Sequence, residues 1–179
     1  MFYVPAISED RFVEYFEIQI AQSDTTVITG LVGSQIKDSV FIAKTLLKNN
    51  KQKFGLNEIK DFHIHFTNND IFKDGPSASL GIFMAILYYQ KYHTKMKLIN
   101  SDFTFLVTGD VDLRGNVKEI GGLEEKRKFF RKENFSLFVI PKEGNEVLRY
   151  SDELSCDNIY DTLSIIEMRA SHVDLIIYL

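Results

Sequence analysis

The sequence predicts an α+β fold, with mixed or antiparallel sheets and packed helices, in which residues 1–179 form a single compact domain. Near the N-terminus, short stretches alternate apolar and polar residues, which is the period of half-buried strands. Residues 78–92, in contrast, are apolar nearly all round, which is typical of a helix that its neighbours cover on most sides. No repeat, low-complexity segment or linker divides the chain, and its 45% apolar content is enough for one sizeable core.

The first part of the chain predicts antiparallel sheet followed by a helix. Residues 12–21 alternate between an apolar and a polar face. The turn-forming Ser23-Asp24 then leads into the β-branched residues 25–29, so we expect these two strands to form a hairpin. Ser34 stands where the N-cap of a helix is expected. The buried stripe of this helix is predicted to consist of Ile36, Val40, Ala43 and Leu47.

Two histidines share one face of the next predicted strand, residues 61–66. His63 and His65 alternate there with apolar residues. Their spacing is compatible with a metal site, but no cysteine, glutamate or third histidine stands nearby at a ligand spacing, so we expect no metal. The strand leads into the loop described below, so the histidines face either solvent or a substrate cleft.

The second half of the chain predicts an alternation of short strands and helices. Strands are expected at residues 103–107, 111–113, 117–120, 137–140 and 159–160. Helices are expected at residues 123–132 and 145–150, followed by a last helix that Asp161 caps and that turns Leu163, Ile166 and Ala170 inward.

Composition argues against several classes of protein. A net charge of −4 and a pI near 5.6 argue against a protein built to bind nucleic acid or an anionic membrane. Cys156 is the single cysteine, so no internal disulfide forms, and the N-terminus lacks the layout of a signal peptide. No apolar run is long enough to span a bilayer. We therefore expect a soluble, cytoplasmic protein, in which Cys156 lies in a polar loop without a neighbouring base and is not a nucleophile.

Ser77 stands where a polar loop, residues 73–76, enters the apolar helix. The free N–H groups and the positive dipole end of a helix start can stabilise an oxyanion, so this is a suitable place for a nucleophilic serine. The alternative is that Ser77 only caps the helix. A matched general base elsewhere in the chain would decide between these readings.

Lys126 is the candidate base. In a helix that starts at Leu123, Lys126 falls into the same apolar arc as Phe130. Such a lysine either extends to solvent along its stem or is desolvated with a lowered pKa, and a neutral amine can take a proton from a serine. The neighbouring basic residues also allow a nucleic-acid face, but nearby glutamates balance them, so we expect no nucleic-acid partner.

Two segments of the chain resemble signatures of the Lon protease family. Lys73-Asp74-Gly75-Pro76-Ser77-Ala78 is similar to the Lys-Asp-Gly-Pro-Ser-Ala-Gly segment around the family's nucleophile. Residues 108–117 and 120–126 resemble the second signature, whose lysine falls on Lys126. Weaker matches at residues 33–39, 63–65 and 139–142 keep the same order, so the resemblance runs from about Thr25 to Met168.

The resemblance implies a serine endopeptidase that cleaves protein substrates through a Ser77–Lys126 dyad and an acyl-enzyme, without a cofactor. Backbone N–H groups at Ser77 and Ala78 would hold the oxyanion. Thr108 matches a position near the lysine and would accept a hydrogen bond from it; alternatively it satisfies only backbone groups at a strand end. Asp74 is expected to shape the turn before the nucleophile by accepting backbone N–H groups.

The chain also departs from the family pattern. Ser79 replaces the usual glycine, and its side chain could narrow the oxyanion pocket or add a hydroxyl to it. Residues 67–72 differ from the usual approach to the nucleophile. No phosphate-binding loop of an ATPase is present, although Lon-type enzymes work as rings, usually hexamers, driven by an ATPase motor. Three arrangements stay open: a stand-alone peptidase, a domain of a larger protein from which this chain lacks the ATPase, or a component that uses the ATPase of a separate partner. The alternative function is a weakly active or inactive binding and oligomerisation module.

Overall fold

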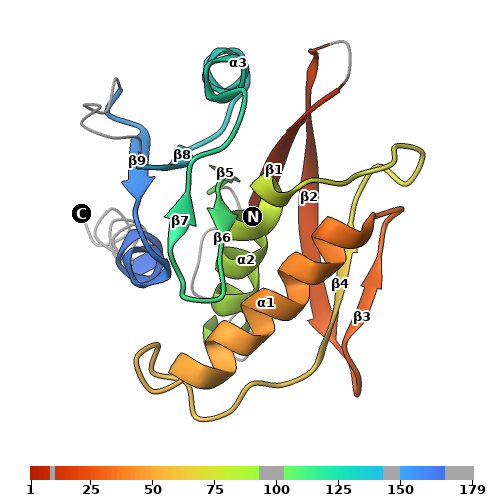
Figure 1. The fold of residues 1–179 in the computed structure, drawn as a ribbon, viewed down its shortest axis with the longest axis vertical. Coiled ribbons are helices and arrows are strands. Elements are labelled where there is room, and N and C mark those ends of the chain that lie inside the picture. The colour runs from red at the N-terminus through yellow and green to blue at the C-terminus, as the bar shows by residue number, and fades with distance from the viewer. Residues whose placement is uncertain (9–10, 93–102, 143–149, 168–179) are drawn as a thin grey trace, which may run out of the picture.

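A computed structural model describes residues 1–8, 11–92, 103–142 and 150–167 of the chain. Its main feature is a mixed seven-stranded sheet with the strand order β3-β4-β2-β1-β5-β8-β9 (Figure 1). The strands of this sheet are β1 (Phe2–Ile7), β2 (Val13–Gln22), β3 (Val27–Thr29), β4 (Phe62–Phe66), β5 (Phe105–Val107), β8 (Leu137–Pro141) and β9 (Glu153–Cys156). A second, two-stranded sheet pairs β6 (Asp110–Val111) with β7 (Val117–Lys118).

The expected antiparallel start of the chain is confirmed, but the expected hairpin is wrong. Strand β2 pairs antiparallel with β1, a strand that we did not predict, and with β4. Strand β3 pairs only with β4, in parallel, so β4 lies between β2 and β3. The apolar side chains of β4, Phe62, Ile64 and Phe66, are fully buried, and a strand with two paired edges achieves this burial better than an edge strand. A local turn signal cannot anticipate such an insertion.

Helices α1 (Ser34–Asn50) and α2 (Ser79–Tyr92) cover one face of the sheet and build the main core with it. The predicted stripe of α1 and the nearly uniform burial of α2 up to Leu87 are confirmed. Ser34 is not the N-cap: Gly33 takes that position without a side-chain bond, and Ser34 is the first helical residue.

Helix α3 (Leu123–Phe130) covers the opposite face of the sheet. In β5 and β8, Phe105, Val107, Leu137 and Val139 belong to the main core, whereas the residues between them contact the α3 side. Successive strand residues point to opposite faces, so the second core must lie across the sheet. Its buried members are Leu106, Leu123, Phe130, Phe138 and Ile140.

The C-terminal part corrects two further predictions. Residues 159–160 begin a helix that continues to residue 167, and the last strand is β9 instead. Asn158 accepts the N–H of Tyr160 at the helix start, while Asp161 lies within the first turn and accepts the N–H groups of residues 157 and 158. The predicted helix at 145–150 lies almost wholly outside the described residues, as does Ala170. Within the described part of the chain, no helix has the length and apolarity needed to cross a bilayer.

Candidate active site

Ser77 lies in the short 3-10 helix η1 (Pro76–Ala78), which runs directly into α2. The turn before it requires Gly75, whose φ of 122° is a conformation that side chains disfavour. Ser77 therefore does not cap α2. Its hydroxyl instead accepts a hydrogen bond from another element.

The loop that presents Ser77 is fixed from within by Lys73, which our sequence analysis did not single out. Lys73 is only 1% exposed, and its Nζ donates to the carbonyl oxygens of Gly30 (3.0 Å), Asn68 (2.5 Å) and Ile71 (2.7 Å). These bonds attach residues 68–73 to the end of β3. The sequence signal was present, since Lys73 begins the family's nucleophile segment, but periodicity gives no direction for a loop side chain.

Asp74 attaches the same loop to helix α1. Its Oδ1 accepts the backbone N–H of Ile36 at 3.2 Å, and the N–H of Gly33 donates to the carbonyl of Lys73 at 2.8 Å. Asp74 thus accepts a backbone N–H, as expected, but the donor lies in the first turn of α1 and not in the turn before the nucleophile.

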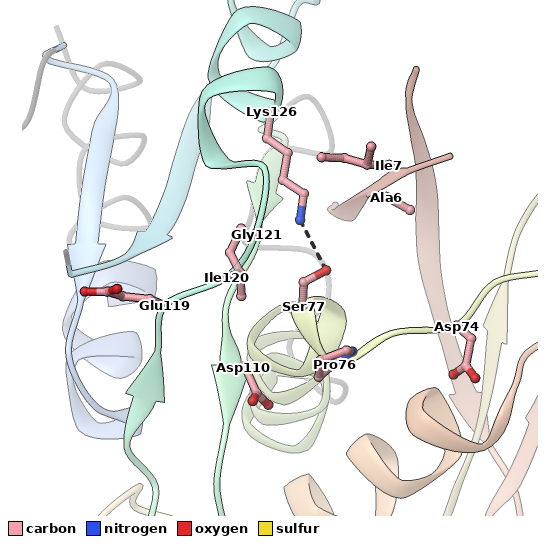
Figure 2. A pocket seen from close by; sticks show the side chains of 10 residues that line it. All are labelled: Ala6, Ile7, Asp74, Pro76, Ser77, Asp110, Glu119, Ile120, Gly121 and Lys126. Atoms are coloured by element: carbon pink, nitrogen blue, oxygen red, sulfur yellow. Dashed lines mark hydrogen bonds between the residues drawn. The ribbon is translucent and has the colours of Figure 1, made fainter. Parts of the chain in front are cut away.

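Lys126 extends from helix α3 to Ser77, past the end of the central strand β1 (Figure 2). Its Nζ lies 3.2 Å from Ser77 Oγ and 3.0 Å from Thr108 Oγ1. The residue is 2% exposed, so the alternative in which its stem extends to solvent does not hold. Burial lowers the pKa of Lys126 from 10.5 to about 8, because a charged ammonium loses its hydration there. The ammonium form therefore still predominates at pH 7, but a minor fraction of the amine is neutral there and the neutral form predominates above pH 8.

Thr108 contacts both the amine and the nucleophile loop. Its hydroxyl donates to the backbone carbonyl of Ser77 at 3.2 Å. A hydroxyl has only one proton, so toward Lys126 Thr108 Oγ1 acts as an acceptor. The alternative in which Thr108 satisfies only the backbone is incomplete, since the side chain contacts both the backbone and the lysine.

Ser77 and Lys126 both line a cavity of about 320 Å³. Its apolar wall comes from Ala6 and Ile7 at the end of β1 and from Pro76 and Ile120. The remaining lining residues are Asp74, Ser77, Asp110, Glu119, Gly121 and Lys126. A cavity of this size beside a serine–amine contact can hold part of an extended peptide.

Ser79 corrects our expectation about the oxyanion pocket. The side chain is 2% exposed and does not line the cavity. Its Oγ accepts the N–H of Val111 at 2.6 Å and donates to the carbonyl of Gly109 at 3.1 Å, so it points toward β6. The hydroxyl therefore neither narrows the space beside Ser77 nor adds a donor there. Ala78 is buried directly after Ser77, and the oxyanion role of its N–H stays a prediction.

His63 and His65 lie on the face of β4 opposite to its buried phenylalanines, as predicted, but they do not line this cavity. His63 Nε2 and His65 Nδ1 each lie 2.8 Å from Thr29 Oγ1. A role for them in a substrate cleft therefore has no support from the arrangement. Among the described residues, no group of three or more His, Cys, Asp or Glu side chains could hold a metal ion.

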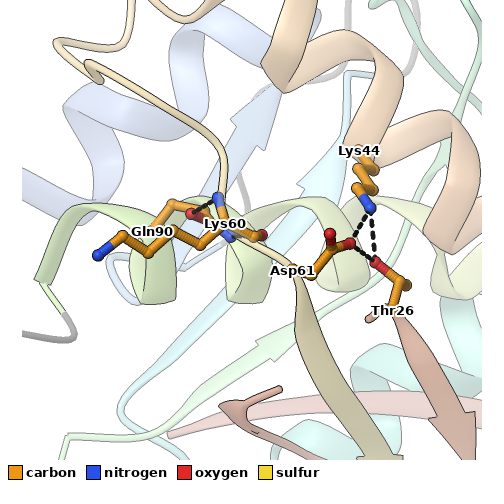
Figure 3. Close-up of polar contacts among 5 residues, drawn as sticks. All are labelled: Thr26, Lys44, Lys60, Asp61 and Gln90. Atoms are coloured by element: carbon orange, nitrogen blue, oxygen red, sulfur yellow. Dashed lines mark hydrogen bonds and ion pairs between the residues drawn. The ribbon is translucent and has the colours of Figure 1, made fainter. Parts of the chain in front are cut away.

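A second cavity, of about 230 Å³, lies where the chain passes from α1 to β4. Gln90 forms two hydrogen bonds with the backbone of Lys60 in its wall, and the nearby Lys44 contacts Thr26 and Asp61 (Figure 3). These polar groups satisfy one another and include no serine or cysteine beside a base. Cys156 lies elsewhere, buried in β9 and not in a loop, and burial raises its pKa to about 12, so it is no nucleophile.

Comparison with known proteins agrees with this geometry. The family model of the Lon protease (S16) C-terminal proteolytic domain matches residues 11–177. Lon protease homolog 2, peroxisomal, of Caenorhabditis elegans is 36% identical over 129 residues, which are 71% of this chain and 16% of that protein. Lon protease of Rickettsia felis is 33% identical over 153 residues, 83% of this chain and 18% of that protein. The chain thus spans less than a fifth of the length of these relatives, and it belongs to the family of the Lon protease C-terminal proteolytic domain.

Proposed function

We propose that this domain hydrolyses peptide bonds, with Ser77 as the nucleophile and Lys126 as the general base. The contact that carries the proposal is the 3.2 Å separation between Ser77 Oγ and Lys126 Nζ in a site where the amine is buried. A buried lysine without a carboxylate partner is costly unless its neutral form is used, and a neutral amine beside a serine is suited to proton abstraction.

The hydrogen bonds suggest how the proton moves. In the neutral amine, one N–H donates to Thr108 Oγ1, which leaves the lone pair free to accept the proton of Ser77. Ser77 Oγ then attacks the substrate carbonyl, and Lys126 passes the proton to the leaving amine as the peptide bond breaks. In the second half of the reaction, Lys126 takes a proton from the water that attacks the acyl-enzyme and returns it to Ser77 Oγ as the acyl C–O bond breaks, which releases the acid product and restores the serine and the neutral amine.

The oxyanion would be held by the backbone N–H groups of Ser77 and Ala78. In serine proteases, one such donor typically contributes about 2.7 to 4 kcal/mol to transition-state stabilisation. This part of the proposal needs no charged side chain, which agrees with the position of Ser77 at the start of α2.

Substrates and partners come from the family and from the names of the relatives. We propose protein or peptide substrates, a homo-oligomeric ring, and unfolding of folded substrates by an ATPase in a partner or in another part of the protein. Nucleic acid and membranes are not expected as partners. Lys126 and Arg127 of the basic run in α3 are buried, which leaves fewer charges to bind a phosphate backbone.

A direct test combines casein cleavage with labelling by a fluorophosphonate, which reacts with activated serines. The protein should cleave casein and become labelled at Ser77, and Ser77→Ala should abolish both. The matched control is Ser39→Ala, which removes another buried hydroxyl, one that bonds only the carbonyl of Gln35 within α1. Full activity in a folded Ser77→Ala protein would show that the nucleophile is misassigned.

The alternative function, a catalytically weak or inactive binding module, was suggested by Ser79. That residue points away from the cavity, so the observation that motivated the alternative no longer supports it. Failure of a folded, oligomeric protein to react with the probe at any pH up to 9 would restore the alternative.

A further inference from the structure

The hydroxyl of Ser79 joins two segments that both carry residues of the proposed active site. Ser79 is the first residue of α2, two positions after Ser77. Its bonds to the N–H of Val111 and the carbonyl of Gly109 use the hydroxyl both as acceptor and as donor, while Asp110 Oδ1 lies further away at 3.5 Å. Ser79 thus connects the helix of the nucleophile with residues 109–111 at the start of β6.

Residues 109–111 continue directly from Thr108, the acceptor of Lys126. Two backbone hydrogen bonds also hold Gly109 against the segment that carries Ser77. The N–H of Gly109 donates to the carbonyl of Ser77 at 2.9 Å, and the N–H of Leu80 donates to the carbonyl of Gly109 at 3.1 Å. The approach is close: a Cβ on Gly109 would lie only 3.0 Å from side-chain atoms of Leu80 and Val117. The distance from Thr108 Oγ1 to Ser77 therefore depends on how firmly this segment is held against α2.

The direction of the lysine amine depends in turn on Thr108. A lysine side chain has four rotatable bonds and carries no preferred direction of its own. The hydroxyls of Thr108 and Ser77 are the two groups that bond Nζ here. A movement of Thr108 relative to Ser77 would turn the amine away from the nucleophile.

We propose that Ser79 is a positioning residue: its hydroxyl holds the segment Thr108–Val111 against the first turn of α2 and so keeps Lys126 directed at Ser77. The proposal rests on the proposed function of the Ser77–Lys126 pair. It assigns a use to the side chain that stands where the family usually has glycine. Ser79 does not line the cavity, so it acts through Thr108 and not by contact with substrate.

The test compares the protein with Ser79→Ala, which removes the hydroxyl and leaves the N–H of Val111 without its 2.6 Å acceptor. The first readout is the pKa of Lys126, which is measured by NMR of protein whose lysines are labelled with carbon-13 at Cε. We expect this pKa to rise toward its ordinary value by about one unit, because a looser segment lets water reach the amine. The cavity carboxylates Asp74, Asp110 and Glu119 remain in every variant. Asp110 Oδ1 lies 3.5 Å from the removed hydroxyl, so the comparison is repeated in an Asp110→Asn background, where the same rise in the pKa of Lys126 is expected.

The second readout is activity. The kcat for a peptide and the rate of fluorophosphonate labelling should fall about tenfold, with the pH midpoint of labelling moving upward together with the pKa of Lys126. The KM should stay unchanged because Ser79 does not contact substrate. Ser39→Ala is again the matched control. It should change neither the pKa of Lys126 nor the activity, whatever its effect on Tm.

Ser79→Gly is the second variant, in case Ser79→Ala folds poorly, since glycine is the usual residue of the family at this position. If the folded variants keep the pKa of Lys126 and the labelling midpoint of the unchanged protein, Ser79 is only a structural serine and the proposal is wrong. The NMR readout needs no turnover. A protein that is never labelled therefore contradicts the proposed function, while the Lys126 titration still decides the role of Ser79.

Discussion

Lys73 and Lys126 are both almost completely buried, at 1% and 2% exposure, yet their amines meet different acceptors. Lys73 donates to three backbone carbonyls, whereas Lys126 contacts two hydroxyls. A carbonyl only accepts, so three carbonyls are best satisfied by the three protons of an ammonium. A hydroxyl also donates, so it can satisfy the lone pair of a neutral amine. The acceptors, more than burial, distinguish a structural lysine from a candidate base.

The surrounding charges reinforce this difference. Burial lowers the pKa of Lys73, but the carboxylates of Asp70 and Glu14 oppose the shift. For Lys126, burial alone sets the shift and lowers the pKa to about 8. Lys73 is therefore better suited to remain an ammonium that holds the nucleophile loop, and Lys126 to exchange a proton.

The largest expected effect is the loss of activity in Lys126→Met. Methionine fills the buried site without an amine, so peptide hydrolysis should fall by about 10³-fold to 10⁴-fold while the fold is retained. Steady-state kinetics with a fluorogenic peptide and circular dichroism on the same sample measure this. A decrease of less than tenfold would show that Lys126 is not the base, and the two lysines would then both be structural.

Lys73→Met should affect stability instead. The carbonyls of Gly30, Asn68 and Ile71 would lose the lysine as a donor inside the protein, although Asn68 keeps the backbone N–H of Ile71, so we expect the free energy of unfolding to fall by roughly 3 kcal/mol. Urea denaturation at pH 7 measures this. The matched control is Lys44→Met, whose amine pairs with the exposed Asp61, and its cost should be clearly smaller because solvent screens such a pair. Equal costs for the two variants would contradict the structural role of Lys73.

The pH dependence of stability separates the two lysines further. Because the pKa of Lys126 is about 8 in the folded protein and 10.5 when unfolded, the unfolded chain binds more protons between these pH values, and stability rises with pH there. Relative to Lys126→Met, the protein should gain about 3 kcal/mol from pH 8 to pH 10.5 and show a constant difference well below pH 8. Urea denaturation of both proteins across this range gives the comparison. A constant difference over the whole range would mean that Lys126 titrates normally.

The smallest expected effect concerns a single acceptor of Lys126. Thr108→Val keeps the shape of the side chain but removes the hydroxyl that orients the amine, so kcat should fall about tenfold. Thr108→Ser keeps the hydroxyl and should retain most of the activity. If both variants behave alike, the hydroxyl of Thr108 does not orient Lys126, and Ser77 alone directs the amine.

Several features of the fold and of the candidate site were predictable because they depend on local periodicity. The apolar run of α2, the stripe of α1 and the inward direction of Lys126 follow from the helical repeat and are confirmed. Ser77 was located by the change from a polar loop to this apolar run. The order of the signatures added the predicted pairing of Ser77 with Lys126, and the match to the family model confirms the family.

Other features were not predictable, because they depend on which distant segments pack together. The turn after β2 indicated that β3 would pair with β2. In the structure the buried strand β4 lies between them, and β3 pairs with β4 instead. Residues 159–160 fit a strand or a helix equally well, since a short apolar stretch has no distinguishing period. Cys156 looked like a loop residue because its neighbours are polar, whereas pairing with β8 buries it in β9.

The sequence by itself determined where the chain could place a nucleophile and a base, because the start of a helix and its buried face depend on residues that are close in sequence. Only the tertiary structure decided which groups surround them. It directed Lys73 to three carbonyls, Asp74 to α1 and Ser79 to β6, because the hydrogen-bond partners of a buried polar side chain lie on segments that folding brings together.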